Sequence, residues 1–408
     1  MSSGMGFIQK GIYHRRTIMM KTFFLCALGC PRRGIDSQKI FNYLESNGYS
    51  FSEDYRQANL IVISTCAFVK DRENQSIQAL NYYRDNRHDN SKIVVAGCLS
   101  KISPDMIKDY KDIDFLSPRE LDHFDDLIGA DIKFRDIPEP NKIYSHPLFY
   151  DFAAIEPQRM KPKLNVRLDS AYDRDDLFTI RLARGCLGNC SYCAIKFAAG
   201  TLESKPIGEI LLEFKKGLSQ GHRLFTLIAG DTGCYGIDIG TSVVELLSDI
   251  FKIDGAYKLI IKEFNAQWLI KYQSELETLL TTNFDKIDYI IVPVQSASDK
   301  ILRLMQRPYK IENVKSCLRS LKNNIPQLNI TTHIMAGFPG ETEEDFQKSV
   351  DFIREFAFPY VDIYGYEDRP RTQASKLEGK IPQEVIDRRI KKLRKAQEDI
   401  LTKNARSH

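Results

Sequence analysis

Three cysteines each follow a short apolar segment in the first hundred residues, and this repeated unit constrains the fold more than any other feature. Cys30, Cys66 and Cys98 each stand just after a run rich in Phe, Ile or Val, typical of a buried strand. Predicted strands and helices alternate over residues 22–28, 37–47, 60–64, 72–85, 92–96 and 104–110. Such alternation predicts an α/β domain with a mostly parallel sheet. Because parallel strands deliver their carboxyl ends to one edge, we expect the three thiols to converge, although any one alone could be a packed core cysteine.

A second cysteine set lies directly after another predicted strand, residues 178–182. Cys186, Cys190 and Cys193 form a C-x-x-x-C-x-x-C loop. Structural zinc needs four ligands, and no fourth Cys or His is close in sequence, so zinc is disfavoured. A redox C-x-x-C pair would leave Cys186 without a role. Three thiolates on an iron–sulfur cubane leave one iron open to a substrate or cofactor, and we favour this interpretation.

Strand and helix alternate again after this loop. The predicted strands are residues 225–229, 258–262, 289–292, 330–335 and 360–364, with helices such as 206–219 and 343–356 between them. Repeated β/α units over about 200 residues predict a barrel or a partial barrel. The chain then closes with a basic helix over residues 382–402, whose charges we expect to face solvent. The predicted fold class is an N-terminal parallel-sheet α/β domain followed by a partial β/α barrel.

Composition excludes several classes of protein. The chain has 408 residues, of which 43% are hydrophobic and 27% charged, and this excludes intrinsic disorder. No apolar run approaches the roughly 18 residues of a bilayer span, so we expect no membrane partner. The predicted boundaries are an N-terminal extension (1–20), the α/β domain (21–137), a Pro-rich linker (138–176) and the barrel domain with its basic helix (177–408).

The segment from Met19 to Cys30 admits a second interpretation. Its basic start, short apolar run and small residue before Cys resemble a lipoprotein export signal, with Cys30 as the lipid anchor. The apolar run is short for a signal, a long extension precedes Met20, and Pro31 and two arginines follow the cysteine. We therefore favour a strand, and a reducing cytoplasm as the location.

The two cysteine sets and their neighbours resemble the radical S-adenosylmethionine (SAM) methylthiotransferases from Lys21 to Asp399. The loop from Cys186 to Cys193, with Tyr192 before its last cysteine, is similar to the signature whose open iron binds SAM. Residues 28–38, 64–69 and 96–99 are similar to the three motifs that hold an auxiliary cluster in that family. The resemblance implies a radical SAM core at residues 177–408, and two 4Fe-4S clusters and SAM as cofactors.

The resemblance also implies which residues line the SAM cavity. The expected cofactor-binding residues are Tyr192, Gly230, Asp231, Gln295, Gly337 and Pro339. Thr342 is expected to cap the helix that follows. Gly230 stands where the family commonly has Gln or Glu, and Arg33 and Ser64 stand where Asn is common, so the pocket is expected to differ. Cys234 is additional, and we expect a bystander.

The implied activity inserts a methylthio group into an unactivated C–H bond. One SAM methylates a sulfur on the auxiliary cluster, and a second SAM yields the deoxyadenosyl radical. Family members end in a small β-barrel, the TRAM domain, which we expect this chain to lack.

The resemblance leaves the substrate open. The first two cysteine motifs lean toward the branch that modifies a protein aspartate, which favours a peptide or protein side chain, with a flavodoxin or ferredoxin as electron donor. The alternatives are a tRNA adenosine methylthiotransferase, a radical SAM enzyme that inserts sulfur or crosslinks peptides, and a non-catalytic iron–sulfur sensor.

Overall fold

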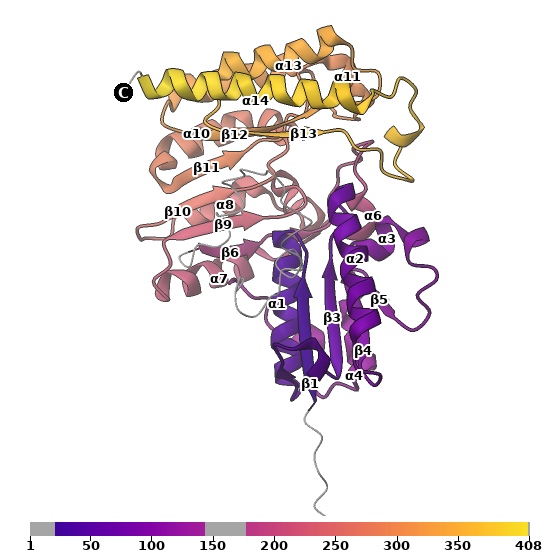
Figure 1. Ribbon diagram of the computed structural model, residues 1–408. Coiled ribbons are helices and arrows are strands. Elements are labelled where there is room, and N and C mark those ends of the chain that lie inside the picture. Colours follow the sequence, from indigo (N-terminus) through magenta and orange to yellow (C-terminus); the bar gives the residue numbers. More distant parts are fainter. Residues whose placement is uncertain (1–20, 143–176, 407–408) are drawn as a thin grey trace, which may run out of the picture.

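Two parallel sheets form the framework of two domains that pack against each other (Figure 1). The structure, a computed structural model, describes residues 21–142 and 177–406. The predicted N-terminal extension and most of the predicted linker lie outside the described residues. Within the part of the chain that is described, none of the helices combines the length and the apolar character that a bilayer span requires.

The N-terminal sheet has five parallel strands in the order β2-β1-β3-β4-β5. The strands are β1 (Thr22–Ala27), β2 (Ser50–Phe51), β3 (Leu60–Thr65), β4 (Lys92–Gly97) and β5 (Asp114–Leu116), and the helices are α1 (Pro31–Ser46), α2 (Lys70–Asn86), α3 (Leu99–Ile102) and α4 (Phe124–Ile128). Alternate residues of β3 face opposite layers: Leu60 and Val62 pack with α1 and α4, whereas Ile61 and Ile63 pack with α2. The chain order reverses between β1 and β3, the point where such sheets bind ligands.

The predicted α/β domain is confirmed, with one helix predicted wrongly. In place of a helix over residues 104–110, the chain forms only a 3-10 turn, Pro104–Met106. Met106 is 44% exposed, and the stretch has too few apolar residues to bury a helical face, which is what stabilises a short helix. Helix α1 begins six residues before its predicted start, because Pro31 occupies its first turn.

The C-terminal sheet has six parallel strands in the order β13-β12-β11-β10-β9-β6. The strands are β6 (Leu177–Arg181), β9 (Leu224–Ile228), β10 (Lys258–Ile261), β11 (Ile287–Ile291), β12 (Ile330–Ala336) and β13 (Val361–Gly365), and a small antiparallel pair joins β7 (Ala183–Arg184) to β8 (Glu203–Ser204). Because β6 and β13 stand at opposite ends of the pairing order, the sheet does not close, and the predicted partial barrel is confirmed.

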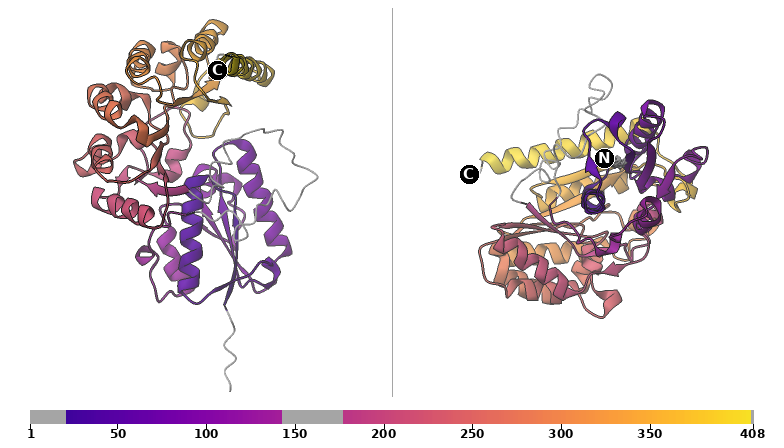
Figure 2. Two further views of the ribbon diagram at one scale, coloured as in Figure 1. Left: turned by 90° about the vertical axis from the view of Figure 1, so that its left-hand side faces the viewer. Right: turned by 90° about the horizontal axis from the view of Figure 1, so that it is seen from below.

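Helix α6 (Ile195–Ala199) of this domain packs against α3 of the N-terminal domain. The other helices cover the outer side of the sheet, and the N-terminal domain lies toward the other side (Figure 2). They are α7 (Ile207–Ser219), α8 (Val243–Phe251), α9 (Ala266–Lys271), α10 (Gln273–Asn283), α11 (Asp299–Leu304), α12 (Ile311–Asn324), α13 (Glu343–Phe356) and α14 (Gln383–Arg406). One large apolar core fills the space between these helices and the sheet.

Buried ion pairs join the two domains. Arg181, the last residue of β6, contacts Asp36 of α1 at 2.8 Å, and Arg369 contacts Glu73 of α2 at 2.9 Å. All four side chains are at most 5% exposed. A buried charge that loses its partner is strongly destabilising, so these pairs favour one fixed arrangement of the domains.

Candidate functional site

Cys30, Cys66 and Cys98, which we call the N-terminal trio, lie at the carboxyl edge of the N-terminal sheet. Cys30 and Cys98 immediately precede the first turns of α1 and α3, and Cys66 follows β3. Burial raises the pKa of Cys66 to about 12, and charges on Cys30 and Cys98 also raise it. The Cys66 thiol therefore interacts electrostatically with the other two thiols of the trio. Burial would raise the pKa of Cys30 as well, but the neighbouring Arg32 and Arg33 outweigh it and lower that pKa.

Gly97 allows β4, the strand that precedes Cys98, to approach β3, the strand that precedes Cys66. Its φ angle is +134°, and a Cβ at this position would lie 2.4 Å from the carbonyl oxygen of Thr65. The same oxygen accepts a hydrogen bond from the Cys98 N–H at 3.3 Å. Only glycine combines this backbone conformation with this contact, which brings the Cys98 loop against the Cys66 loop.

Cys186, Cys190 and Cys193, the C-terminal trio, lie in the loop between β7 and α6. The position that a Cβ would take on Gly188 is 3.2 Å from the Cys186 sulfur and 3.8 Å from the Cys190 sulfur. Burial raises the pKa of Cys193, and charges on Cys190 and Cys186 contribute to the increase. The three cysteines therefore share one loop, and the Cys193 thiol interacts electrostatically with the other two.

Cys234 lies beside this trio, so the predicted bystander is in contact with it. The side chain is buried, and a hydrogen bond with Cys186 raises the pKa of the Cys234 thiol. The thiol also lies 3.1 Å from the carbonyl oxygen of Asp231.

Arg32 joins the N-terminal trio to the segment that follows β9. Its guanidinium interacts with Cys30 and Cys98, and its Nη1 donates a hydrogen bond to the carbonyl oxygen of Ala229 at 3.2 Å. Gly230 comes next, and a Cβ there would lie 2.4 Å from the Gly185 carbonyl oxygen and 3.3 Å from the Cys186 Cβ. A glutamine or glutamate would not fit at this position, which explains the departure from the family pattern. The trios thus border one region at the carboxyl ends of both sheets.

A chain of side chains extends around this region from the Cys30 loop to the Cys66 loop. Glu263, at the end of β10, interacts electrostatically with Arg32 and with His333 of β12. The His333 ring lies 5.7 Å from the ring of Tyr364, which in turn lies 6.4 Å from the ring of Phe68. Glu263 has a φ angle of +56°, a strained conformation that is found preferentially at functional sites.

Tyr192 and Gln295 occupy positions suited to cofactor binding. The Tyr192 hydroxyl accepts a hydrogen bond from Arg307 at 2.9 Å, and its ring lies 6.4 Å from the ring of Phe338. Phe338 separates Gly337 from Pro339, so these predicted residues lie near the C-terminal trio. Gln295 is 7% exposed, and its side-chain oxygen has no hydrogen-bond partner among the described residues. A buried acceptor of this kind is suited to a donor from a bound molecule.

Asp231 is held by its own neighbours. Its carboxylate accepts hydrogen bonds from the Trp268 indole at 2.8 Å, and from the backbone N–H groups of Gly233 and Asn265 at 3.1 and 3.2 Å. Burial raises the pKa of Asp231 despite these three donors. The contacts make Asp231 the centre of the turn after β9, and its binding to a cofactor stays a prediction.

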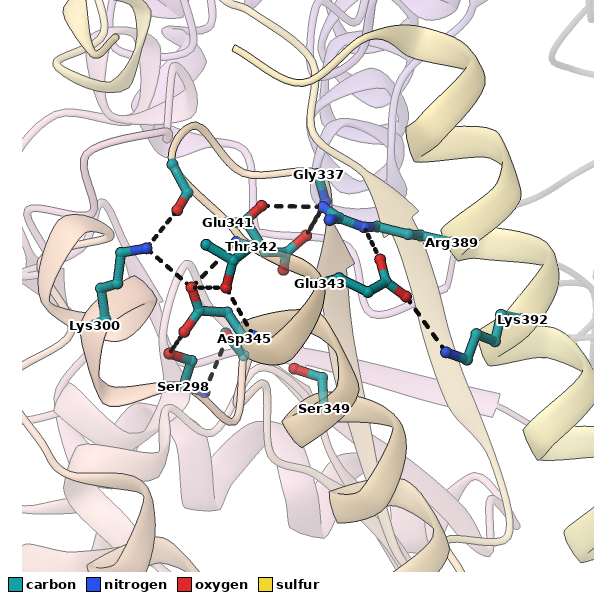
Figure 3. A network of polar contacts seen from close by, with 12 residues as sticks. Ser298, Lys300, Gly337, Glu341, Thr342, Glu343, Asp345, Ser349, Arg389 and Lys392 are labelled. Carbon is teal, nitrogen blue, oxygen red and sulfur yellow. Dashed lines mark hydrogen bonds and ion pairs between the residues drawn. The ribbon is translucent and has the colours of Figure 1, made fainter. Parts of the chain in front are cut away.

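The turn that contains Gly337 is held by α14 (Figure 3). The Glu341 carboxylate accepts hydrogen bonds from the Gly337 N–H at 2.7 Å and from Arg389 of α14 at 2.8 Å. Burial raises the pKa of Glu341 to about 7. The C-terminal helix therefore stabilises the backbone of a predicted SAM-binding turn.

Thr342 caps α13, as predicted. Its hydroxyl accepts a hydrogen bond from the Asp345 N–H at 3.2 Å, and the Asp345 carboxylate accepts one from the Thr342 N–H at 3.1 Å. Burial would raise the pKa of Asp345, but donors that include Ser298 and Lys300 outweigh it and hold that pKa well below its usual range. Figure 3 shows these residues converging on the first turn of the helix.

The donor sets fit iron–sulfur clusters better than a single ion. Among residues 21–142 and 177–406, no three Cys, His, Asp or Glu side chains gather closely enough to hold one metal ion. A structural zinc needs four ligands, and each trio offers three thiolates. Three thiolates match an iron–sulfur cluster with one open iron.

Four residues of this site are not singled out by the sequence. Arg32, Glu263, Arg307 and His333 reach the site from four separate segments. Arg32 lies within the motif of residues 28–38, but none of the four differs in sequence from an ordinary polar residue, so only the assembled fold reveals their contacts.

Comparisons with known proteins match both halves of the chain. The pattern of the Radical SAM superfamily matches residues 180–353, and that of Uncharacterized protein family UPF0004 matches residues 22–117. Ribosomal protein uS12 methylthiotransferase RimO of Carboxydothermus hydrogenoformans is 32% identical over 383 residues, which are 93% of this chain and 82% of the relative. Threonylcarbamoyladenosine tRNA methylthiotransferase MtaB of Thermotoga maritima is 30% identical over 93% of this chain and 83% of its own.

Solved structures with this fold include two radical SAM enzymes. The methyltransferase TsrM of Kitasatospora setae, with cobalamin and a 4Fe-4S cluster bound, has a TM-score of 0.62 at 12% identity and covers 87% of this chain and 77% of its own. The cobalamin-dependent enzyme OxsB has a TM-score of 0.56 at 12% identity, over 92% of this chain and 56% of its own. At these identities the likeness shows the fold alone.

Proposed function

The chain belongs to the radical SAM methylthiotransferase family, and on that premise we propose that it inserts a methylthio group into an unactivated C–H bond of a peptide or protein side chain. Enzymes of this family use SAM and two 4Fe-4S clusters. The observation that supports the proposal is that Arg32, which interacts with Cys30 and Cys98, also donates a hydrogen bond to Ala229, next to the Gly230 turn that contacts Cys186.

The two trios are proposed to hold different clusters. Cys186, Cys190 and Cys193 would bind the cluster that meets SAM, and the N-terminal trio would bind the auxiliary cluster that carries sulfur. When bound and reduced, the SAM cluster supplies the electron that cleaves SAM and so produces a radical able to abstract hydrogen. Both trios supply only thiolates, which leaves one iron of each cluster without a protein ligand.

The remaining residues are proposed to bind and orient SAM. Gln295 offers a buried side-chain acceptor, and the Tyr192 hydroxyl is oriented by Arg307. Gly337 and Pro339 present backbone to the cofactor in a turn that Glu341 stabilises. Gly230 leaves room beside Cys186, and the role of Asp231 is to shape the turn that carries Gly230. These residues would hold the cofactor, and the iron clusters and SAM would supply the chemistry.

A protein substrate is supported by the RimO relatives, whose names specify ribosomal protein uS12. A cytoplasmic location and a flavodoxin or ferredoxin as electron donor accord with such a substrate. The MtaB relative, named for a tRNA, makes an adenosine of tRNA the alternative substrate.

The test is turnover of the anaerobically reconstituted protein with dithionite and SAM. Two probes are compared: recombinant ribosomal protein uS12 and threonylcarbamoyladenosine-bearing tRNA. We expect 5′-deoxyadenosine, and uS12 that gains the mass of one sulfur and one CH2. Gain of that mass by tRNA alone would refute the protein substrate. A gain of sulfur without the CH2 would refute methylthio transfer, and absence of deoxyadenosine would indicate a sensor rather than an enzyme.

Cysteine variants separate the roles of the trios. Replacement of Cys186, Cys190 or Cys193 by Ala should abolish deoxyadenosine formation, because SAM then has no cluster to reduce it. Replacement of Cys30, Cys66 or Cys98 by Ala should preserve SAM cleavage and stop methylthio transfer. Cys317→Ala, at a buried cysteine of α12 that contacts Gln273 of α10, is the matched control and should preserve both reactions.

A further inference from the structure

One loop of the C-terminal domain contacts the backbone beside a cysteine of each trio. Residues 366–377, which we call the bridging segment, follow β13 and precede α14. In Figure 1 they belong to the golden loop that extends from β13 toward α2 and α6. Arg371 within the segment has a φ angle of +67°, a left-handed conformation that non-glycine residues rarely adopt. The surrounding contacts must therefore hold the segment in this shape.

Arg369 extends from the bridging segment to the N-terminal trio. Its guanidinium donates to both carboxylate oxygens of Glu73 at 2.9 and 3.0 Å, and to the carbonyl oxygen of Ala67 at 3.0 Å. Ala67 directly follows Cys66. The Arg369 and Glu73 side chains are 4% and 3% exposed, so water does not compete for these bonds. The two-pronged geometry is one that arginine can make and lysine cannot.

Two further contacts attach the segment to the same domain. The Glu367 carboxylate accepts a hydrogen bond from the Lys70 N–H at 2.6 Å, at the first turn of α2. Arg371 donates to the carbonyl oxygen of Lys101 at 2.8 Å, in the short helix α3 that begins after Cys98. Its guanidinium also lies 4.5 Å from the centre of the Phe197 ring on α6.

The other end of the segment holds the C-terminal trio. The Ala374 N–H donates to the carbonyl oxygen of Ser191 at 2.8 Å, and Ser191 lies between Cys190 and Cys193. Ala374 is fully buried. Arg369 and Ala374 are only five positions apart, so a short length of chain connects the backbone beside Cys66 to the backbone beside Cys190.

We propose that Arg369 is a positioning residue, which fixes the spacing between the two trios through the bridging segment. The inference rests on the proposed function, because this spacing matters to the reaction only when both trios hold clusters. A substrate radical formed at one cluster must meet sulfur at the other, and a misplacement of about 1 Å can lower such a rate on the order of 10²-fold.

The test uses full-length protein with both clusters, two variants of the buried pair, a rescue variant and a control. Arg369→Gln alone leaves the buried Glu73 carboxylate without its main partner and can prevent folding. The second variant, Arg369→Gln with Glu73→Gln, keeps similar side-chain volumes without a buried charge. Arg369→Lys tests rescue by charge alone, and Arg319→Gln removes an exposed arginine that pairs with Glu312 and Glu355 on the outer helices. Pulsed EPR measures the magnetic coupling between the two dithionite-reduced clusters, with no substrate present.

The neutral pair is the variant Arg369→Gln with Glu73→Gln. We expect it to keep the iron content of the wild type and the wild-type rate of SAM cleavage without substrate. The distribution of cluster–cluster distances should widen or shift. With uS12 as the probe, deoxyadenosine released per methylthiolated product should rise by up to about 10²-fold. Lysine should restore these values only in part, and Arg319→Gln should match the wild type. An unchanged distance distribution in the neutral pair would overturn the proposal, as would loss of half the iron, since Arg369 would then be needed to form a cluster rather than to place it. Failure of the proposed function is distinguishable, because the wild type itself would then lack irons or deoxyadenosine.

Discussion

The identity of certain residues in this site is determined by how closely two backbone segments approach each other. Gly97 and Gly230 each stand where any Cβ would lie within 2.4 Å of a carbonyl oxygen beside a cysteine. The cysteines could be found from the sequence, because three of them repeat at predicted strand ends and three more form a C-x-x-x-C-x-x-C loop, whereas a single cysteine could be core packing. The need for glycine at these two positions could not be predicted from the sequence, because it depends on contact with a neighbouring strand or loop.

Substitution Gly97→Ala should therefore affect one trio only. The positive φ angle and the contact with Thr65 should reduce the free energy of unfolding by about 3 kcal/mol. Iron per reconstituted chain should fall from about eight to about four, with SAM cleavage retained. Gly208→Ala is the control, because no atom lies within 4 Å of its Cβ position. Iron analysis of Gly97→Ala that still shows about eight atoms would contradict this view of the trio.

The Glu341 carboxyl should make stability depend on pH. Its pKa in the folded protein is raised to about 7, above the roughly 4.3 of an unfolded chain. Between these values the folded state binds more protons than the unfolded state, so the free energy of unfolding decreases as pH rises, and the loss is complete above about pH 7.

Urea unfolding at several pH values between 5 and 8 measures this effect. The free energy of unfolding of the wild type minus that of Glu341→Gln should decrease as pH rises, by no more than about 1.4 kcal/mol per pH unit. Glu343→Gln is a matched control, because Glu343 also pairs with Arg389 but is 60% exposed. Parallel pH profiles for wild type and Glu341→Gln would show that Glu341 does not titrate in this range.

At the scale of elements, α13 and the segment 104–110 show what sequence can and cannot predict. The bounds of α13 agree with the prediction to the residue, because Thr342 and Asp345 form a capping box and apolar residues recur at helical spacing. Residues 104–110 begin with a proline, which is common at the start of a helix, but they lack the apolar face that a short helix needs for packing. Local signals are sufficient only where a buried face supports them.

The C-terminal helix α14 is an integral part of the barrel domain. Ile386, Leu393, Ala396 and Ile400 are buried against it, and exposed basic residues such as Lys391 and Lys395 occupy the other face. The predicted solvent-facing charges are confirmed at these positions. The helix also holds the Gly337 turn through Arg389, so its packing and the cofactor site are coupled.

Truncation of the buried face should reveal this role. Leu393→Ala should reduce the free energy of unfolding by about 2–5 kcal/mol, because Leu393 is fully buried. Leu401→Ala, at a leucine of the same helix that is 45% exposed, should change it by less than about 0.5 kcal/mol. Chemical unfolding of both variants provides the comparison, and equal effects would mean that α14 does not pack as described.

At the scale of the whole molecule, the arrangement of the two domains depends on contacts that no sequence pattern predicts. Asp36 and Arg181 are 145 positions apart, and Glu73 and Arg369 are 296 apart. In one sequence each of these residues is an ordinary charged side chain. The two sheets and the two trios could be predicted separately, whereas their junction follows only from the assembled structure.

Iron and sulfide analysis of the anaerobically reconstituted protein tests the central claim most directly. Two incomplete four-iron clusters predict about eight irons per chain in the wild type. Replacement of all three cysteines of either trio by alanine should leave about four irons, and only the variant with an intact C-terminal trio should still cleave SAM. A wild type that binds only about four irons when fully loaded, or an N-terminal triple variant that retains all eight, would contradict the claim that each trio holds its own cluster.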